Sequence, residues 1–458
     1  MADKKDDLME KIVSLAKRRG FIYPGSEIYG GFGGVYDYGP YGVELANNIR
    51  AAWWRAMVQE EDNIVGLDSA IITHPKVWEA SGHVSGFSDP LVECKSCHTR
   101  FRADHLLEGV GVFADEKISL EEINTVFDGE RLNLSCAYCG KKDFTEVKRF
   151  NLLAQTNLGN FSTDWTKDPT YLRGETCQGI YLNFKNVVDS SRVKIPFGIA
   201  QIGKAFRNEI APRQFIFRLR ELTQMEMQMF VAPEDEMKIY EEWRTKRWQY
   251  YLNLGFKEEN LKWHEHENLV FYAKAAWDIE YNFPFGFKEL EGVHARGNYD
   301  LTQHQTFSGK DLSYLNQETK ERFIPHVVET SVGLDRTFLA VLTEFYDEDE
   351  LGGETRTVLR FPKKLAPIKA AVSPLLRNKP ELVAKAREVF TLVRKNLMCE
   401  WDDNGNIGKR YRRQDEIGTP YCVTIDFETL ENDTVTVRDR DTGEQKRVAV
   451  TELVRTIS

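Results

Sequence analysis

The stretch from Lys194 to Val231 constrains the fold of this chain most, because polar and apolar residues alternate along much of it. Period-two alternation predicts β-strands, and a polar loop at residues 210–214 divides the stretch into an antiparallel hairpin. One predicted face of the second strand is mainly apolar and consists of Phe215, Phe217, Leu219, Thr223, Met225, Met227 and Met229. The opposite face is largely polar or charged and consists of Ile216, Arg218, Arg220, Leu222, Gln224, Glu226, Gln228 and Phe230.

The polar face of this hairpin suits a ligand with phosphates at one end and an ammonium group at the other. Arg218 and Arg220 occupy alternate positions, and Gln224 and Glu226 follow along the same face. Guanidinium groups bind phosphate through paired hydrogen bonds, whereas a carboxylate binds an ammonium ion. A solvated hairpin with surface ion pairs is the alternative, and the hairpin considered alone favours neither.

The length of 458 residues predicts two to four domains, and the net charge of −10 argues against nonspecific coating of nucleic acid. A nucleic-acid partner that meets a local basic face remains compatible with that charge. No apolar run is long enough to span a bilayer, and the opening segment MADKKDDLMEKIVSLAKRRG lacks the apolar core of a signal peptide. We therefore expect a cytoplasmic protein without a membrane partner.

Two Cys-x-x-Cys pairs, Cys94 with Cys97 and Cys136 with Cys139, flank residues 98–135. Four thiolates in two such pairs suit a closed tetrahedral Zn²⁺ site, which supports structure and leaves no open position for chemistry. Free thiols are the alternative, whereas a redox role is disfavoured because neither pair lies in a βαβ pattern. The odd count of seven cysteines does not indicate a disulfide framework.

Three other segments have patterns that predict regular structure. A helix is predicted from residue 40 to about 59, because proline suits its first turn, and a strand is predicted at 64–73. This pair is either a dimer element or an ordinary part of the core. A further strand at 288–296 is predicted to carry Glu289 and Glu291 on one face.

A predicted strand at 323–330 runs into a helix that Ser331 is placed to cap. The apolar stripe of this helix consists of Leu334, Phe338, Val341, Leu342 and Phe345. Arg336 falls in the first turn, where a cation opposes the helix dipole. An anion bound between the helix N-terminus and Arg336 would account for its position.

The acidic, glycine-containing run 347–354 predicts a linker. Strands and helices alternate after it, which predicts a separate α/β domain at 356–458. A basic segment in this domain predicts either a basic binding face or a solvated helix, and its cations are Lys409, Arg410, Arg412 and Arg413.

Taken in order, these segments resemble class II aminoacyl-tRNA synthetases, and specifically the bacterial homodimeric type of the glycyl-tRNA synthetase family. The resemblance rests on RGETCQG (173–179), FRNE (206–209), RELTQME (220–226), ELEG (289–292) and ETSVGLDR (329–336). It implies an α+β catalytic domain, built on an antiparallel sheet flanked by helices, with a zinc-ribbon-like insertion and a C-terminal α/β anticodon-binding domain. The implied ranges are 1–350 for the catalytic domain, 86–150 for the insertion and 356–458 for the anticodon-binding domain. The three class II motifs correspond to about 41–75, 195–231 and 323–346.

The resemblance implies a two-step ligase reaction. Glycine and ATP give glycyl-adenylate and pyrophosphate, and glycine then passes to the terminal adenosine at the 3′ end of tRNA(Gly). It also implies a homodimer, Mg²⁺ that accompanies ATP, and a structural Zn²⁺ held by Cys94, Cys97, Cys136 and Cys139.

The resemblance assigns residues to each substrate. The implied ATP-binding residues are Arg207, Asn208, Glu209, Phe217, Arg218, Leu222, Glu289, Leu290, Gly333 and Arg336. The implied glycine-binding residues are Arg100, Glu175, Gln224, Glu226, Glu329 and Ser331. Arg207, Arg336 and Glu289 are the implied catalytic residues, at the α-phosphate, the γ-phosphate and the Mg²⁺ ion respectively. Carboxylates suit glycine, because its ammonium group is its main handle and a crowded pocket excludes any Cβ.

One residue departs from the family pattern. Leu222 lies where the family commonly has an aromatic that stacks on adenine, so we expect weaker ATP binding, and strand parity places Phe217 on the opposite face. A non-catalytic, synthetase-like binding subunit is an alternative that the retained arginines and carboxylates disfavour. The glutamates Glu175, Glu226 and Glu329 disfavour a class II synthetase for proline, threonine or serine. A zinc-dependent enzyme is disfavoured because four thiolates would fill all coordination positions of the zinc ion.

Overall fold

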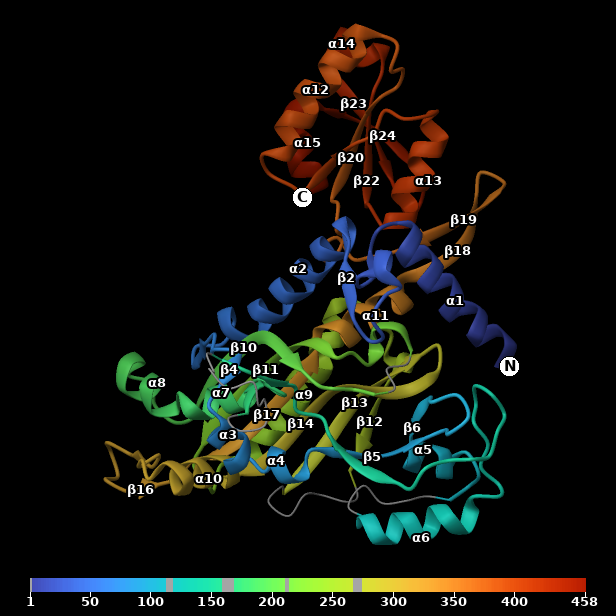
Figure 1. Cartoon of the computed structure of the whole chain (residues 1–458). Coiled ribbons are helices and arrows are strands. Elements are labelled where there is room, and N and C mark those ends of the chain that lie inside the picture. Colours follow the sequence, from blue (N-terminus) through green and yellow to red (C-terminus); the bar gives the residue numbers. More distant parts are fainter. Residues whose placement is uncertain (1, 113–117, 159–168, 211–213, 267–273) are drawn as a thin grey trace.

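A seven-stranded sheet organises the larger, N-terminal part of the chain in the computed structural model, which describes residues 2–112, 118–158, 169–210, 214–266 and 274–458 (Figure 1). Its strands, in spatial order, are β12 (Leu261–Glu265), β13 (Ala275–Phe283), β14 (Gly286–Gly297), β17 (His326–Gly333), β11 (Glu221–Val231), β10 (Phe197–Phe206) and β3 (Ile64–Gly66). Neighbouring strands run antiparallel except β10 and β3, which are parallel. The predicted antiparallel sheet is confirmed.

Strands β10 and β11 form the predicted hairpin, but the second strand begins later than its alternation suggests. Phe215–Phe217 form a 3₁₀ turn, and β11 begins only at Glu221. Gln214 and Phe215 adopt left-handed backbone conformations, with φ of 64° and 58°. These conformations break the period of two, so the face assigned to Phe217 from strand parity is wrong.

Both faces of β11 are buried. Met225, Met227 and Met229 pack into the large core on one face, while Gln224, Glu226 and Gln228 are buried on the other. Helix α7 (Cys177–Leu182) covers the polar face, where the Tyr181 hydroxyl donates to Gln228 Oε1 at 2.8 Å. The solvated hairpin is therefore excluded as a description of this strand.

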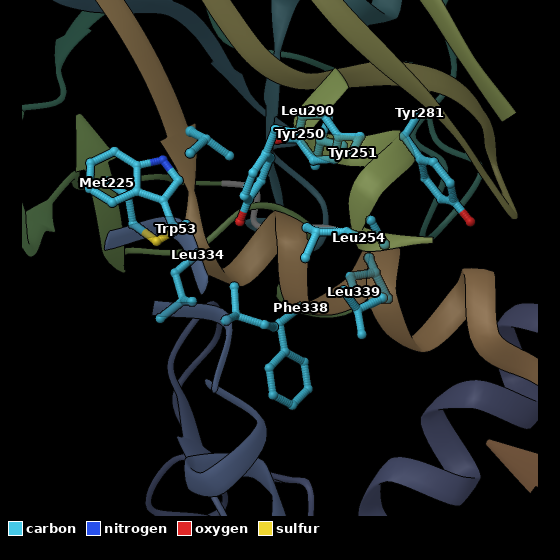
Figure 2. Close-up of a cluster of buried hydrophobic side chains, with 14 of the residues drawn as sticks. Trp53, Met225, Tyr250, Tyr251, Leu254, Tyr281, Leu290, Leu334, Phe338 and Leu339 are labelled. Carbon is cyan, nitrogen blue, oxygen red and sulfur yellow. The ribbon is translucent and has the colours of Figure 1, made fainter. Parts of the chain in front are cut away.

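The helices on the methionine face are α2 (Pro40–Trp54), α9 (Glu236–Leu254) and α11 (Leu334–Phe345). Figure 2 shows part of this core, where side chains from α9, α11 and the sheet gather around the labelled residues Met225, Tyr251, Leu254, Phe338 and Leu339. The stripe predicted for α11 lies within this core. The predicted cap is wrong, because β17 continues through Ser331 and Gly333 is the residue that precedes the helix.

The opposite face of the sheet carries a second, smaller core. Helices α7, α8 (Phe184–Ser191) and α10 (Tyr299–Ser308) cover it. Phe184 lies at its centre, with its ring centroid 4.6 Å from that of Phe230 on β11 and 6.0 Å from that of Phe197 on β10. The sheet is thus enclosed by helices on both sides.

The helix and the strand predicted within residues 40–73 are divided into more elements than the sequence suggests. The chain continues beyond α2 in a wider π-helical turn, Arg55–Gln59, so the helical region ends where predicted. The single strand predicted at 64–73 is wrong, because β3 is followed by a separate β4 (Ile72–Thr73). Strand β4 pairs with β9 (Thr170–Leu172), which in turn pairs with β8 (Gln155–Thr156).

The region of the two cysteine pairs forms a small unit beside the main sheet. Its elements are β5 (Ser88–Glu93), β6 (Arg100–Arg102), α5 (Ala103–Glu108), α6 (Leu120–Glu130) and β7 (Lys148–Asn151). Phe101, Phe127 and Phe144 form part of a core of its own. The remaining elements of the N-terminal part are α1 (Ala2–Arg18), β1 (Ile22–Pro24), η1 (Glu27–Tyr29), β2 (Tyr36–Tyr38), α3 (Pro75–Ala80), α4 (His83–Gly86), η4 (Glu258–Asn260), β15 (Tyr314–Leu315) and β16 (Arg322–Phe323).

The predicted linker at 347–354 is wrong, since this segment lies within a hairpin of β18 (Tyr346–Leu351) and β19 (Glu354–Leu359). Its acidic residues are paired, because Asp349 accepts hydrogen bonds from Arg356 and Asp347 accepts one from Arg360. Complementary charges across the hairpin explain why an acidic run folds here.

The C-terminal α/β unit is confirmed, and Figure 1 shows it as the red lobe beyond the hairpin. Its elements are β20 (Ala370–Pro374), α12 (Pro380–Arg394), β21 (Cys399–Trp401), α13 (Ile407–Ile417), β22 (Tyr421–Ile425), α14 (Phe427–Asn432), β23 (Thr434–Asp439), β24 (Gln445–Ala449) and α15 (Val450–Ile457). The basic segment is helix α13, but Arg410 is buried and donates to the backbone oxygens of Pro374 and Gly405. Across the described ranges, no helix has both the length and the apolar character that crossing a bilayer requires.

Replacing Phe338 with alanine tests the role of α11 in the large core. The ring is fully buried, so we expect the free energy of unfolding to fall by about 3–5 kcal/mol, as measured by urea titration of tryptophan fluorescence. Phe307→Ala is the matched control, because Phe307 is half exposed on α10 and its loss should change the free energy by about 0.5 kcal/mol or less. Equal effects of the two substitutions would contradict this description of the core.

Candidate active site

A cavity of about 490 Å³ opens between the main sheet, the turn before β11 and the cysteine-containing unit. Its wall carries arginines from four separate segments, namely Arg102, Arg207, Arg218 and Arg336. Acidic residues are interspersed among them, namely Asp89, Asp104, Glu209, Glu289 and Asp335. Such a wall suits a polyphosphate and its counter-ions better than an apolar ligand.

Phe217 and Leu222 both line this cavity, contrary to their assignment to opposite faces of one strand. The guanidinium carbon of Arg336 lies 4.6 Å from the centroid of the Phe217 ring. Arg336 also forms an ion pair with Glu289, with 2.8 Å between Nη1 and Oε2. The aromatic ring, the leucine and the arginine together form a place where a flat, electron-rich base can lie.

A β-bulge directs Glu289 into the cavity. The register between β13 and β14 shifts so that Ile279 pairs with Glu291 but the next residue, Glu280, pairs with Glu289. Glu291 consequently faces the helix side, where it is fully buried and bonds Arg247 and Tyr251 of α9. The prediction that Glu289 and Glu291 share a face is wrong, because alternation fails at a bulge.

The predicted residues Arg207, Glu209 and Arg218 lie together on the cavity wall. Arg207 donates from Nε to the backbone oxygen of Gly174 at 3.1 Å, and its guanidinium carbon lies 5.3 Å from the ring centroid of Phe87. Arg218 Nη1 lies 3.6 Å from Glu209 Oε2. These contacts hold two cations at the cavity while leaving them partly exposed.

Behind the cavity wall, the polar face of β11 contributes a buried carboxylate, Glu226. Its Oε1 accepts from Ser331 Oγ at 2.8 Å and from Gln224 Nε2 at 3.0 Å, and its Oε2 accepts from Thr176 Oγ1 at 2.6 Å. Burial, together with the nearby charges of Glu329 and Glu175, raises the pKa of Glu226 to about 7. Ser331 and Gln224 also line the cavity, so they join it to this carboxylate.

Glu175 and Glu329 complete a cluster of three carboxylates. Although burial alone would raise it, the pKa of Glu175 lies well below its usual value because His83 and Arg296 favour the ionised form. Burial likewise opposes ionisation of Glu329, yet Arg296 and His294 lower its pKa to about 2. The ligand atoms of Cys177, Glu226 and Glu329 lie within 4.8 Å of one another. The cluster therefore holds two ionised carboxylates and one that titrates near neutrality.

Gly333 lines the cavity, whereas six other residues predicted to bind ATP or glycine do not. Three of these, Glu175, Glu226 and Glu329, form the carboxylate cluster behind the cavity wall. Arg100 is exposed and pairs with Glu93 at 3.0 Å, because β6 runs from the cysteines toward the cavity and Arg102, not Arg100, lies at its cavity end. Asn208 is exposed and is held through its backbone N–H, which donates to Leu152. Leu290 is buried in the large core.

The four cysteines of the two pairs are brought together. Sγ of Cys94 lies 3.6 Å from that of Cys139, and Sγ of Cys97 lies 3.6 Å from that of Cys136. Four sulfurs placed tetrahedrally about 2.3 Å from one Zn²⁺ would lie about 3.8 Å apart. The positions of these thiols therefore fit a zinc ion.

The two cysteine turns have the same backbone geometry. His98 and Gly140 each follow the second cysteine of a pair with a left-handed φ, of 57° and 71°. Each donates its N–H to the oxygen of the first cysteine in its pair, at 2.8 Å. The turn is therefore the same whether its last residue is glycine or histidine.

The sequence patterns missed several residues of the site. Thr176 and Cys177 follow Glu175 directly, so the same segment could have suggested them, and both are buried in the carboxylate cluster. His83 contacts Glu175, with 3.3 Å between Nε2 and Oε1, but it lies far away in sequence and no local pattern marks it.

Comparison with known families covers most of the chain. Residues 160–345 match the family described as tRNA synthetase class II core domain (G, H, P, S and T), and residues 369–458 match the family described as anticodon binding domain. The glycine–tRNA ligase of Clostridium kluyveri is 52% identical over 454 residues, which cover 97% of this chain and 96% of that protein. The glycine–tRNA ligase of Clostridium tetani is 50% identical over 98% of both chains.

The chain belongs to the glycine–tRNA ligase family. A relative from another genus supports this membership, because the glycine–tRNA ligase of Treponema denticola is 50% identical over 98% of this chain and 96% of its own length. Class II synthetases use ATP with Mg²⁺, and the negative charge of ATP is complementary to the arginines that line the cavity.

Replacing Phe217 with leucine tests its place in the cavity. We expect ATP binding to weaken about threefold to tenfold, because the ring in contact with Arg336 is lost and such cation–π contacts are worth about 0.5–2 kcal/mol. The Kd for ATP, measured by isothermal titration calorimetry, reports the change. Phe215→Leu is the matched control, since Phe215 packs against Tyr36 and does not line the cavity. An unchanged Kd in the Phe217 variant would contradict the assignment.

Proposed function

We propose that this chain activates glycine with ATP and transfers it to the terminal adenosine of tRNA(Gly), with the arginine-lined cavity holding the nucleotide and the carboxylate cluster holding glycine. One observation carries this assignment. Gln224 and Ser331 lie on the cavity wall and both donate to Glu226, so the place for phosphates adjoins the place for an ammonium group. That order matches a substrate pair in which the amino acid attacks the nucleotide.

The nucleotide end of the site rests on its distributed positive charge. Arg207 is proposed at the α-phosphate, where negative charge develops during attack, and Arg336 at the γ-phosphate. Arg218 is proposed beside the remainder of the triphosphate, with Glu209 near the adenine. Phe217 and Leu222 both offer surface to the adenine ring, because both line the cavity. The leucine thus has an aromatic neighbour that strand parity had excluded.

The glycine end of the site rests on charge and on lack of space. Glu175 and Glu329 stay ionised through their cationic neighbours, while Glu226 ionises when an ammonium group arrives. Cys177 and Thr176 are buried against these carboxylates and occupy room that a side chain on the substrate would need. A filled pocket of this kind rejects larger amino acids sterically, which is the easier direction of discrimination.

The first step joins the two ends of the site. A carboxylate oxygen of glycine attacks the α-phosphorus of ATP, and the bond from that phosphorus to the pyrophosphate oxygen breaks. The protein contributes position and charge stabilisation to this step rather than a covalent intermediate. In the second step, a ribose hydroxyl of the terminal adenosine of the tRNA attacks the glycyl carbonyl, and AMP leaves.

Two metals fit the side chains that are present. Glu289 would hold Mg²⁺ through an ionised oxygen at the cavity. The main reason is that the charge of Arg336 lowers the pKa of this carboxyl. Mg²⁺ would neutralise charge on the phosphates. Cys94, Cys97, Cys136 and Cys139 would hold a structural Zn²⁺ with no open position.

The remaining proposals concern the tRNA partner, the assembly and the location of this protein. The C-terminal unit, which matches an anticodon-binding family, is proposed to contact tRNA(Gly). The bacterial homodimeric type of enzyme and a cytoplasmic location stay predictions. A non-catalytic binding subunit is disfavoured because Arg207, Arg336 and Glu289 all line one cavity.

Pyrophosphate exchange with each of the twenty amino acids tests the proposed function. With ATP and Mg²⁺ present, we expect exchange with glycine alone, because the pocket leaves no room for a Cβ. Exchange with another amino acid would overturn the specificity while keeping the ligase assignment. Absence of any exchange from folded protein that binds ATP would favour the non-catalytic subunit.

Glu226 gives glycine binding a predicted pH dependence. Because its pKa is raised to about 7, Glu226 is neutral below that pH in the free protein and charged above it. We therefore expect the KM for glycine to rise as the pH falls through about 7, while the KM for ATP changes little. Steady-state exchange kinetics between pH 6 and 8.5 measure both constants.

Glu226→Gln should raise the KM for glycine at pH 8 by at least about 30-fold, because truncating a buried charged partner costs about 2–5 kcal/mol. It should also remove the inflection near pH 7. Glu221→Gln is the matched control, since Glu221 is exposed on the same strand and pairs with Lys204. Wild-type affinity for glycine in the Glu226 variant would refute its role.

A further inference from the structure

Three neighbouring strands on the β12 side of the main sheet bring together two histidines and an aspartate, none of which is assigned to a substrate. His266 follows the edge strand β12, Asp278 lies on β13 and His294 lies on β14. The N–H of His266 donates to the oxygen of Ala276, which extends the β12–β13 pairing by one step. The sheet register thus brings together three residues that are separate in sequence.

We propose that His266, Asp278 and His294 form a binding site for a divalent transition-metal ion such as Zn²⁺. Two imidazoles and a carboxylate favour such an ion over Mg²⁺, which prefers oxygen ligands. The site is distinct from the four cysteines and does not depend on the proposed function.

The distances from the Asp278 carboxylate to the two histidines are close to those around a shared metal ion. Asp278 Oδ2 lies 2.8 Å from His266 Nε2, and Asp278 Oδ1 lies 3.5 Å from His294 Nε2. One ligand atom from each residue lies within 4.8 Å of the others. Neighbouring ligands about 2.0–2.1 Å from a tetrahedral or octahedral metal lie about 3–3.5 Å apart, so only small side-chain shifts are needed.

A second carboxylate orients the inner histidine for this role. His294 Nδ1 lies 3.0 Å from Glu329 Oε2, and Glu329 Oε1 in turn accepts from Gln228 Nε2 at 2.8 Å. When Nδ1 of a histidine donates to a carboxylate, a metal ion can displace the proton on Nε2 and bind there, and this arrangement is common around zinc. Glu329 therefore fixes the ring with Nε2 directed at Asp278.

Gly292 leaves the space in which this ring lies. A Cβ at position 292 would come within 2.7 Å of His294 Cε1 and 2.8 Å of its Nε2. It would also come within 3.3 Å of Asp278 Oδ1. The ring leans toward Asp278 only because this neighbouring position has no side chain.

Solvent reaches the site from one side. Asp278 is buried and His294 is partly exposed, while the His266 side chain is 42% exposed. A metal ion can enter past His266 and keep water in its remaining coordination positions. A hydrogen-bonded relay without metal is the alternative that the experiment must separate.

Titration of the full-length protein with Co²⁺ tests the proposal. Cobalt held by nitrogen and oxygen ligands gives weak visible d–d bands, whereas cobalt in the four-cysteine cluster adds intense thiolate charge-transfer bands. We expect the wild-type protein to show the weak bands as a separate binding event. Their absence at saturating Co²⁺ would overturn the proposal.

His266→Ala and Asp278→Asn should each weaken this second binding event by about tenfold or more, because even outer-shell changes commonly cost 10–100-fold in metal affinity. His264→Ala is the matched control, since His264 is also exposed on β12 but lies outside the ligand set. Circular dichroism verifies that each variant is folded. Wild-type affinity in the His266 variant, or an equal loss in the His264 variant, would overturn the assigned ligands.

Discussion

The structure depends on one constraint, which is that strand β11 has no face in water from Thr223 onward. It is paired on both edges, with β10 and β17, and it is covered on both faces. The methionines on one face satisfy this condition by packing. The polar residues on the other face must find partners inside the protein, because a buried charge without a partner is costly. Glu226 meets this need through Thr176, Ser331 and Gln224.

The carboxylate cluster follows from that constraint. Arg173 holds the segment with Glu175 and Thr176 over the sheet, by donating to the backbone oxygens of Lys204 and Ser69. Arg296 and His294 keep Glu329 ionised. Burial and the nearby charges of Glu329 and Glu175 instead raise the pKa of Glu226. A buried pocket with excess acid is a costly arrangement that an ammonium group would relieve, which supports the proposed glycine site.

The arginine-lined cavity holds positive charges near solvent. Each arginine there lies near an acidic residue, a carbonyl oxygen or an aromatic ring, so its charge is held in place without being fully neutralised. The cysteine-containing unit takes part, because the strands beside its first thiol pair also carry Asp89 and Arg102 to the cavity wall. A metal bound at the thiols would therefore support the shape of the cavity through two short strands.

The sequence by itself determined features that depend on local pattern. Alternation identified the hairpin of β10 and β11, helical periodicity identified α11, and spacing identified the four cysteines that the fold brings together. The segments around Glu226 and Arg336 also sufficed to identify the family. These features are local because each depends on neighbouring residues, or on motifs in a fixed order.

Only the tertiary structure decided which side chains meet. The left-handed residues before β11 placed Phe217 in the cavity, and the bulge in β14 separated Glu289 from Glu291. The direction of β6 selected Arg102 rather than Arg100, and the register of three strands joined His266, Asp278 and His294. The physical reason is the same in all four cases. Register, bulges and strand direction arise from pairing between distant segments, and the alternation of residues within one segment does not predict that pairing.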